Sequence, residues 1–208
     1  MVVQRGRLMK YSRLLFGPLT AAILSFAGGP AHAANLVTNG SFEDPAINTV
    51  DGSPTYDYTS SIANWTSGGH ATVLFNAAYR PVSDALQAVQ LEQPADALSQ
   101  SFATVVSQAY QLTFDYSGYD AGPSSLYVSA GDNSGTYVAT SSSYQTVTMN
   151  FNATSTSTTL LFRNDGIYAV SYPQIDNVSV TAVPEPETYA MLLAGLGALG
   201  FLARRRRD

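Results

Sequence analysis

The sequence of 208 residues contains no cysteine. Disulfide bonds and thiolate metal sites are therefore excluded, so a folded domain must depend on its hydrophobic core or on a hard cation bound through oxygen atoms. Histidine is also scarce, and beyond His32 only His70 remains. One histidine without cysteine cannot complete a typical zinc site.

Basic residues are almost absent from the middle of the chain. Between residues 34 and 183, Arg80 and Arg163 stand against twelve acidic residues, which gives this region a net charge of about −10. A nucleic-acid partner is excluded because its binding requires a basic surface. The other basic residues are confined to the two ends, four before residue 14 and four at 204–207.

The first 33 residues have the pattern of a Sec signal peptide. Basic residues precede an apolar stretch at 14–29, and the small residues Ala31 and Ala33 stand where signal peptidase requires them. We expect export by the Sec machinery and cleavage after Ala33, with Met1 or Met9 as the start. The alternative is a permanent N-terminal anchor, but the apolar run is short and is interrupted by Pro18.

An apolar segment also precedes the C-terminal arginines. Residues 184–186 read Pro-Glu-Pro, and they are followed by an apolar run at 189–203. As a helix this run is about 22 Å long, against roughly 30 Å of bilayer hydrocarbon. The arginine cluster is expected to stay cytoplasmic and to place the preceding domain outside.

This order of features resembles the PEP-CTERM sorting signal of Gram-negative bacteria that make exopolysaccharide. The resemblance implies transient anchoring in the inner membrane, processing by an exosortase, and a final place at the cell surface or in the extracellular matrix. An ordinary tail anchor is the alternative, but it needs no Pro-Glu-Pro and is usually longer. The residues that carry the motif are Pro184, Glu185, Pro186, Arg204, Arg205, Arg206 and Arg207.

The central region has the pattern of many short strands. β-Branched and aromatic runs are bounded by turn-forming residues, and several alternate with a period of two. A break in phase between Ile175 and Val178 predicts a β-bulge or an inward-facing polar residue. The predicted strands are residues 35–38, 62–66, 72–75, 87–91, 97–103, 110–116, 125–130, 136–140, 144–151, 158–163 and 174–182.

The fold class predicted from this pattern is an all-β sandwich, flanked by a signal peptide and a short C-terminal hydrophobic helix. The domains are residues 1–33, 34–183 and 184–208. Six segments together resemble the galactose-binding-like jelly roll of carbohydrate-binding modules: NLVTNGSFE from residue 35, the INW-type residues 62–65, LSQSF from 98, YQLTFDYSG from 110, LLFRND from 160 and PQIDNVSV from 173.

That resemblance implies that Glu43 and Asp176 lie side by side and hold a structural calcium ion. Both carboxylates are in segments expected to be partly buried, where a carboxylate without a partner is costly. With only two arginines in the domain, a cation is one solution. Solvation or hydrogen bonds from turn amides are the alternatives.

Sugar-binding sites usually stack pyranose rings on exposed aromatic side chains and bond the hydroxyls with polar groups. The domain has one tryptophan and many tyrosines near predicted loops. Trp65 has a second interpretation as a core residue. The predicted ligand-binding residues are Trp65, Tyr79, Arg80, Tyr119 and Asp120.

No catalytic residue is predicted. His70 lies in a glycine-rich stretch that does not resemble a nucleophile elbow, and nothing in the sequence raises the pKa of only one of Asp115 and Asp120. The prediction is an exported, non-catalytic surface or matrix protein that binds exopolysaccharide. The alternative is a small polysaccharide-processing enzyme, a lyase or a glycosidase, on the same scaffold.

Overall fold

The computed structural model describes residues 34–47, 55–59, 61–70, 72–119, 123–184 and 186–205. The predicted cleavage residues Ala31 and Ala33 lie outside the described residues, as do Asp120 and Glu185 and the arginines at 206 and 207. The strands are β1 Tyr56–Thr59, β2 Thr66–Gly68, β3 Thr72–Asn76, β4 Gln87–Leu91, β5 Ala97–Ala103, β6 Ala109–Gly118, β7 Ser124–Ala130, β8 Asn133–Ala139, β9 Gln145–Asn152, β10 Ser157–Asn164 and β11 Pro173–Ala182.

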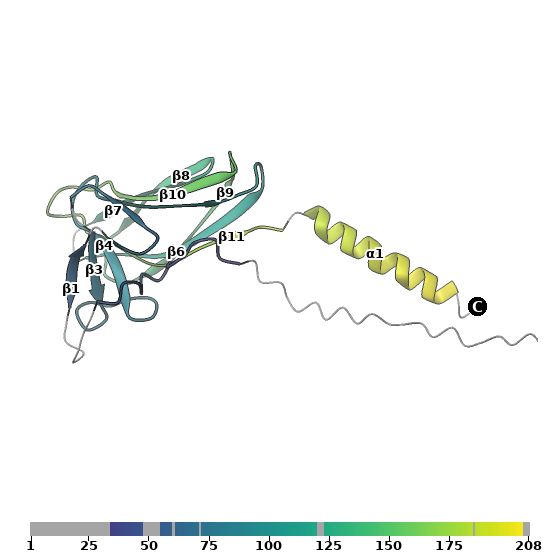
Figure 1. Ribbon diagram of the computed structural model, residues 1–208, viewed down its shortest axis with the longest axis horizontal. Coiled ribbons are helices and arrows are strands. Elements are labelled where there is room, and N and C mark those ends of the chain that lie inside the picture. The colour runs from purple at the N-terminus through teal and green to yellow at the C-terminus, as the bar shows by residue number, and fades with distance from the viewer. Residues whose placement is uncertain are drawn as a thin grey trace, which may run out of the picture. The chain divides into compact units, whose positions relative to one another are not determined.

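These strands form two antiparallel sheets that make a β-sandwich (Figure 1). The six-stranded sheet has the order β1-β3-β4-β11-β6-β9, and the five-stranded sheet has the order β2-β5-β10-β7-β8. Many neighbours in each sheet are far apart in sequence, as in the pairing of β11 with β4 and with β6. The predicted all-β sandwich is confirmed.

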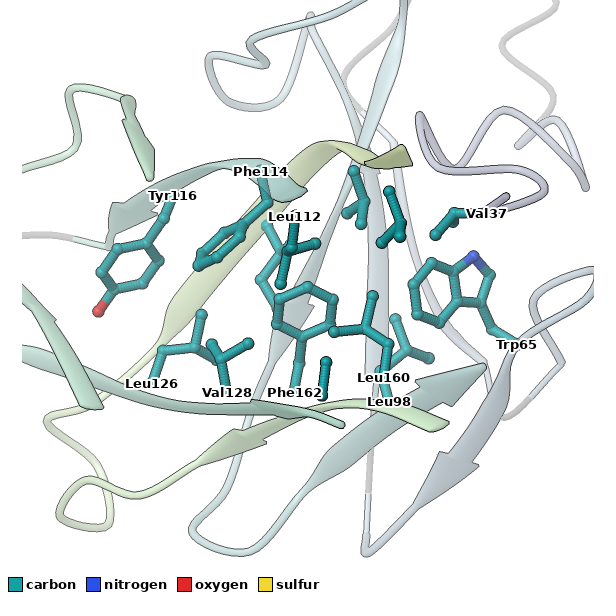
Figure 2. Packing of buried hydrophobic residues seen from close by; sticks show 14 of the residues in the cluster. Val37, Trp65, Leu98, Leu112, Phe114, Tyr116, Leu126, Val128, Leu160 and Phe162 are labelled. Carbon is teal, nitrogen blue, oxygen red and sulfur yellow. The ribbon is translucent and has the colours of Figure 1, made fainter. Parts of the chain in front are cut away.

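The core lies between the two sheets. Figure 2 shows Leu112 and Phe114 of β6 pointing toward Leu126 of β7 and Phe162 of β10. These side chains are fully buried. Every residue of the described core lies between Leu36 and Ala182, so the segment 34–183 contains this core in full and we expect it to fold as one domain.

The alternation read from the sequence explains this packing. Tyr110, Leu112, Phe114 and Tyr116 share one face of β6 as predicted, and all four are buried. Since successive side chains of a strand point to opposite faces, a period-two apolar pattern turns one complete face of the strand toward the core.

Two strand predictions are wrong at the N-terminal side. Residues 35–38 run beside β11 but form no strand, because the Asn35 side chain replaces regular ladder bonds: its Oδ1 accepts from Val180 N at 2.9 Å and from Val37 N at 3.0 Å. Of the predicted strand 62–66, only Thr66 belongs to β2. The edge strand β1 is a further element that the sequence pattern did not predict.

The predicted irregularity in the last strand is confirmed. The pairing of β11 with β6 changes register between Asp176 and Ser179, and Asn177 has a positive φ of 49°. The bulge brings the β11 backbone against the opening segment, where Val178 N donates to Gly40 O at 2.8 Å. A Cβ at Gly40 would lie 2.1 Å from Val178 O, so this contact requires glycine.

The C-terminal helix α1 spans Pro186–Arg205 and has Arg204 and Arg205 in its last turn. Its apolar side chains, among them Leu193, Leu199 and Phe201, are exposed. In the described part of the chain, no helix has the length and hydropathy needed to span a membrane.

Candidate functional site

The face of the six-stranded sheet that points away from the core carries an unusual row of polar side chains. Cross-strand register aligns Val73 with Gln90, Gln90 with Gln174, and Gln174 with Ser117. Gln174 Nε2 donates to Gln90 Oε1 at 3.1 Å, and Ser117 Oγ donates to Gln174 Oε1 at 3.1 Å. The glutamines are only 2 % exposed, so something covers this face.

Part of that cover is the β3–β4 loop, residues 77–86, which carries Tyr79 and Arg80. Arg80 Nη1 donates to Gln90 Oε1, so the guanidinium lies over the polar row. The guanidinium carbon is 3.6 Å from the ring centroid of Tyr119 and 4.7 Å from that of Tyr79. These distances are within the range of cation–π contacts and bring the two tyrosines to one place.

More tyrosines extend this group across the surface. Tyr56 lies 4.9 Å from Tyr79 and 5.7 Å from Tyr58 between ring centroids, and Tyr119 lies 5.9 Å from Tyr172. Tyr58 is 60 % exposed and Tyr56 is 49 % exposed, so their rings are open to a ligand. The tyrosine cluster is defined as Tyr56, Tyr58, Tyr79, Arg80, Tyr119 and Tyr172.

The β3–β4 loop is fixed by two carboxylates from opposite ends of the domain. Glu43 Oε1 accepts from the backbone amides of Leu86 and Gln87 at 2.9 and 2.8 Å. Asp176 Oδ2 accepts from the amides of Ser83 and Asp84 at 2.9 and 2.8 Å. Both residues predicted to hold calcium therefore accept hydrogen bonds from the same loop.

Hydrogen-bond donors surround the carboxylate oxygens that hold the loop. Calcium is bound by oxygen ligands, whereas the atoms that surround Asp176 Oδ2 are N–H donors and the Ser83 hydroxyl. Among the described residues, no three His, Cys, Asp or Glu side chains come together to hold a metal. A structural calcium stays a prediction, and at these two residues the geometry favours its alternative, hydrogen bonds from turn amides.

A pair of carboxylates lies on the same outward face. Asp115 of β6 is the register partner of Asp176. Thr146 Oγ1 donates to Asp115 Oδ1 at 2.6 Å, and Asn177 Nδ2 donates to its Oδ2 at 3.1 Å. Burial raises the pKa of Asp176 to about 6, and the amide hydrogen bonds oppose this change. Both carboxyl groups are thus engaged by protein donors rather than open to a substrate.

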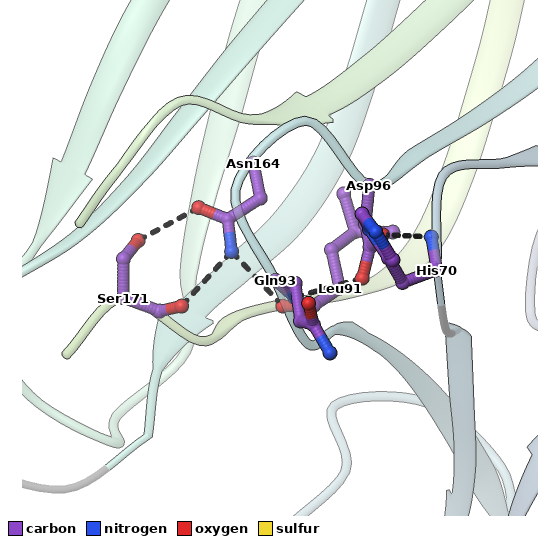
Figure 3. Close-up of polar contacts among 6 residues, drawn as sticks. All are labelled: His70, Leu91, Gln93, Asp96, Asn164 and Ser171. Atoms are coloured by element: carbon purple, nitrogen blue, oxygen red, sulfur yellow. Dashed lines mark hydrogen bonds and ion pairs between the residues drawn. The ribbon is translucent and has the colours of Figure 1, made fainter. Parts of the chain in front are cut away.

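A second polar group, drawn in Figure 3, surrounds Asp96. Asp96 is fully buried and accepts from the backbone amides of His70 and Gln93 at 2.5 and 2.7 Å. The His70 side chain is 72 % exposed, with Nδ1 3.7 Å from Asp96 Oδ1. His70 therefore is a surface-loop residue, as its glycine-rich surroundings predict.

The remaining contacts in Figure 3 are centred on Asn164, which is buried at the end of β10. Its side chain donates to Leu91 O and Ser171 O at 3.2 and 2.9 Å and accepts from Ser171 Oγ at 2.9 Å. The serine hydroxyl in this network is joined to Asn164 and not to His70. The arrangement ties loops together and does not form a Ser-His-Asp triad.

The structure brings together three of the predicted ligand-binding residues, Tyr79, Arg80 and Tyr119. It separates Trp65 from them. Trp65 is 6 % exposed, packs 5.3 Å from Phe42, and belongs to the core, which corrects its placement on a ligand surface. Asp120 lies outside the described residues.

Sequence reasoning missed the polar row beneath the cluster. Gln90 stands in a strand whose five residues are all buried, and Gln174 is the second residue of the last strand, among buried neighbours. Two glutamines within buried strands were the available signal, since a buried amide must find hydrogen-bond partners.

The two packed antiparallel sheets define an all-β sandwich domain. The family model described as protein of unknown function (DUF642) matches residues 35–181, and the chain belongs to this family. The PEP-CTERM protein-sorting motif matches residues 182–207. That motif implies an exported, cell-surface-sorted protein that is processed by an exosortase. Neither of these two models describes an enzyme family.

Solved structures similar to this chain include TmCBM61 in complex with β-1,4-galactotriose, at 16 % identity over 73 % of this chain and 100 % of that chain, with a TM-score of 0.55. The Stig cyclase FisC from Fischerella sp. TAU matches at 17 % identity over 74 % and 99 %, with a TM-score of 0.53. An arabinose-bound α-L-arabinofuranosidase matches at 15 % over 72 % and 26 %, with a TM-score of 0.51. These likenesses establish the fold. No curated protein matches the chain.

Proposed function

We propose that this chain is a non-catalytic matrix or surface protein whose sandwich domain binds exopolysaccharide through the tyrosine cluster. In this proposal the Sec machinery exports it, signal peptidase cuts after Ala33, and the C-terminal segment anchors it transiently in the inner membrane of a Gram-negative bacterium. Exosortase processing near Pro184 then delivers it to the cell surface or the extracellular matrix.

The observation that carries the proposal is the group of exposed tyrosine rings around Arg80. Tyrosine offers an apolar ring face for a pyranose and a hydroxyl for hydrogen bonding. Arg80 fixes Tyr79 and Tyr119 by contact with both rings, which prepares the surface before a ligand arrives. Glu43 and Asp176 hold the loop that carries Tyr79 and Arg80.

The state of the carboxylate pair Asp115 and Asp176 favours binding over catalysis. Glycoside hydrolysis needs two carboxyl groups that can reach the glycosidic bond. Asp176 is fully buried, and both oxygens of Asp115 are engaged by Thr146 and Asn177. Incubation of the domain with exopolysaccharide distinguishes the two hypotheses. New reducing ends or unsaturated products would support an enzyme, and retention of intact polymer would support a binding protein.

The site is tested by affinity electrophoresis of the domain, residues 34–183, in gels that contain polysaccharide. β-1,4-Galactan is the first probe because a module of similar fold was solved with β-1,4-galactotriose, and exopolysaccharide from a bacterium that makes such proteins is the second. We expect Tyr58→Ala and Tyr79→Ala each to weaken retention about tenfold, which corresponds to roughly 1.4 kcal/mol.

Two matched variants separate a role in binding from a general effect. Tyr58→Phe keeps the ring and should retain most of the affinity. Tyr127→Ala removes a tyrosine from the five-stranded sheet, where Tyr127 lies beneath Arg163, and should leave retention unchanged. Equal retention of wild type and Tyr58→Ala,Tyr79→Ala would place any sugar site elsewhere on the domain.

A further inference from the structure

We infer that the polysaccharide bound by the tyrosine cluster is uncharged, an inference that rests on the proposed function. Neutral and acidic polysaccharides are bound by different chemical groups of a protein. An acidic polymer of uronate residues needs accessible cations, whereas a neutral polymer needs ring faces and amide or hydroxyl groups.

The domain offers almost no cations. Between residues 34 and 183, Arg80 and Arg163 face twelve acidic residues, so the net charge of the domain is about −10. A polyanion that approaches this surface is repelled over distances comparable to the Debye length, about 10 Å at 0.1 M salt. The repulsion acts on every charged residue of the polymer near the protein.

Both arginines are already engaged. Arg80 is half-buried, donates through Nη1 to Gln90 Oε1, and has the Tyr119 ring 3.6 Å from its guanidinium carbon. Arg163 lies in the other sheet, 3.1 Å from Asp165 Oδ1 and 4.5 Å above the Tyr127 ring. A uronate is best bound by the two parallel donors of an open guanidinium, and neither arginine presents one.

A negative charge lies beside the tyrosine cluster. Glu92 lies next to the polar row, where it accepts from Gln90 Nε2, and its charge is the main cause that raises the pKa of Tyr58. Glu92 and the most exposed ring of the cluster are therefore close enough to interact. A carboxylate on a sugar stacked at Tyr58 would meet the charge of Glu92, whereas Arg80, a cation that acts on the same ring, is already engaged by Gln90 and Tyr119.

The groups that remain suit neutral sugars. The rings of Tyr56, Tyr58 and Tyr79 are exposed by 49, 60 and 37 %, and each ring offers an apolar face and a phenolic hydroxyl. Such a surface binds by apolar contact and neutral hydrogen bonds, so its affinity should depend little on ionic strength.

The test compares three polymers in affinity electrophoresis of the domain 34–183: β-1,4-galactan, polygalacturonate, and polygalacturonate esterified with methanol. The last two share a backbone and differ in charge. Carboxyl-reduced and native exopolysaccharide from a producing bacterium form a second matched pair. Each is measured at about 0.02 M and about 0.5 M NaCl, between which charge interactions are strongly screened.

We expect neutral polymers to bind at least about tenfold more tightly than their charged counterparts at low salt, with less than about a twofold change in high salt. Glu92→Gln removes one negative charge while it keeps a side-chain oxygen for Gln90. It should improve retention by the charged polymers and leave neutral binding unchanged.

Two results would overturn different claims. Tighter binding of a charged polymer than of its neutral counterpart, weakened by salt and lost in Arg80→Gln, would refute this inference and leave sugar binding standing. Absence of retention by all five polymers, with wild-type circular dichroism, would contradict the proposed function, and this inference would fall with it.

Discussion

The pH dependence of folding is the most direct test of how Asp176 is held. Asp176 is fully buried, and burial raises its pKa from 3.8 to about 6 against the opposing hydrogen bonds of Asp84, Asn177 and Ser83. The folded state therefore binds this proton more tightly than the unfolded chain does. Between about pH 4 and pH 6 the unfolded chain has lost the proton while the folded chain keeps it, so the free energy of unfolding falls as pH rises.

The size of the effect follows from the same pKa. A rise from 3.8 to about 6 corresponds to roughly 3 kcal/mol, because a change of one in pKa is worth about 1.4 kcal/mol. This stabilisation is fully present below about pH 4 and is lost above about pH 6. Asp176→Asn removes the titration but keeps an oxygen that can accept from the Ser83 and Asp84 amides. Relative to wild type, the variant should gain about 3 kcal/mol between about pH 4 and pH 7.

Urea unfolding of the domain 34–183 measures this difference. Trp65, the single tryptophan, is buried in the core, so its fluorescence reports unfolding. Asp115, the register partner of Asp176, is present in wild type and in Asp176→Asn. The difference in unfolding free energy between these two proteins therefore reports the titration of residue 176. Asp132→Asn is the control of opposite sign, because bonds from Asn152 lower the pKa of Asp132 and its contribution is lost as pH falls. A difference between wild type and Asp176→Asn that stays constant with pH would refute this account of Asp176.

Four other outcomes follow from the structure. Because turn amides already bond Glu43 and Asp176, the domain should melt at the same temperature in calcium and in chelator, and a higher midpoint in calcium would establish an ion. Gly40→Ala places a Cβ 2.1 Å from Val178 O, and urea unfolding should show a loss of stability of about 1–3 kcal/mol or more. Gly68→Ala is the control, because its Cβ would lie 3.8 Å from Ala97 Cβ and should leave stability nearly unchanged. Tyr116→Phe removes the hydroxyl that bonds Ser124 O and Ala139 N and should cost about 1–3 kcal/mol by the same measurement; an unchanged midpoint would contradict a role for that hydroxyl. Mass spectrometry of the mature protein from its host should find the Arg204–Arg207 cluster removed, and an intact arginine tail would contradict exosortase processing.

The fold was predictable because the strands carry its signal locally. β4 and β5 have the bounds that their residue pattern predicts, and the phase break before Val178 marks the bulge in β11. Each of these features needs only the alternation of side chains within one strand. Residues 35–38 misled the same reasoning, because the Asn35 side chain satisfies the backbone of the neighbouring strand in place of a ladder.

The candidate site was predictable only in part, because contacts between distant segments define it. Tyr79, Arg80 and Tyr119 carry the right chemistry in the sequence, but their meeting depends on the β3–β4 loop folding over Gln90. Trp65 shows the opposite case. Its residue type suits a ligand surface, yet its place between Phe42 and Phe162 is a property of the core that composition does not reveal.

The two loop-holding carboxylates link the site to the completion of folding. Glu43 reaches the loop from the opening segment, 43 residues before Leu86, and Asp176 reaches it from the last strand, 92 residues after Asp84. Since β11 is the last strand in the chain and pairs with β4 and β6, the support that Asp176 gives the loop requires the complete domain. A truncation before β11 therefore removes the support of Tyr79 and Arg80 even though both residues remain. Binding by the tyrosine cluster should consequently require the last strand as well as the residues of the cluster itself.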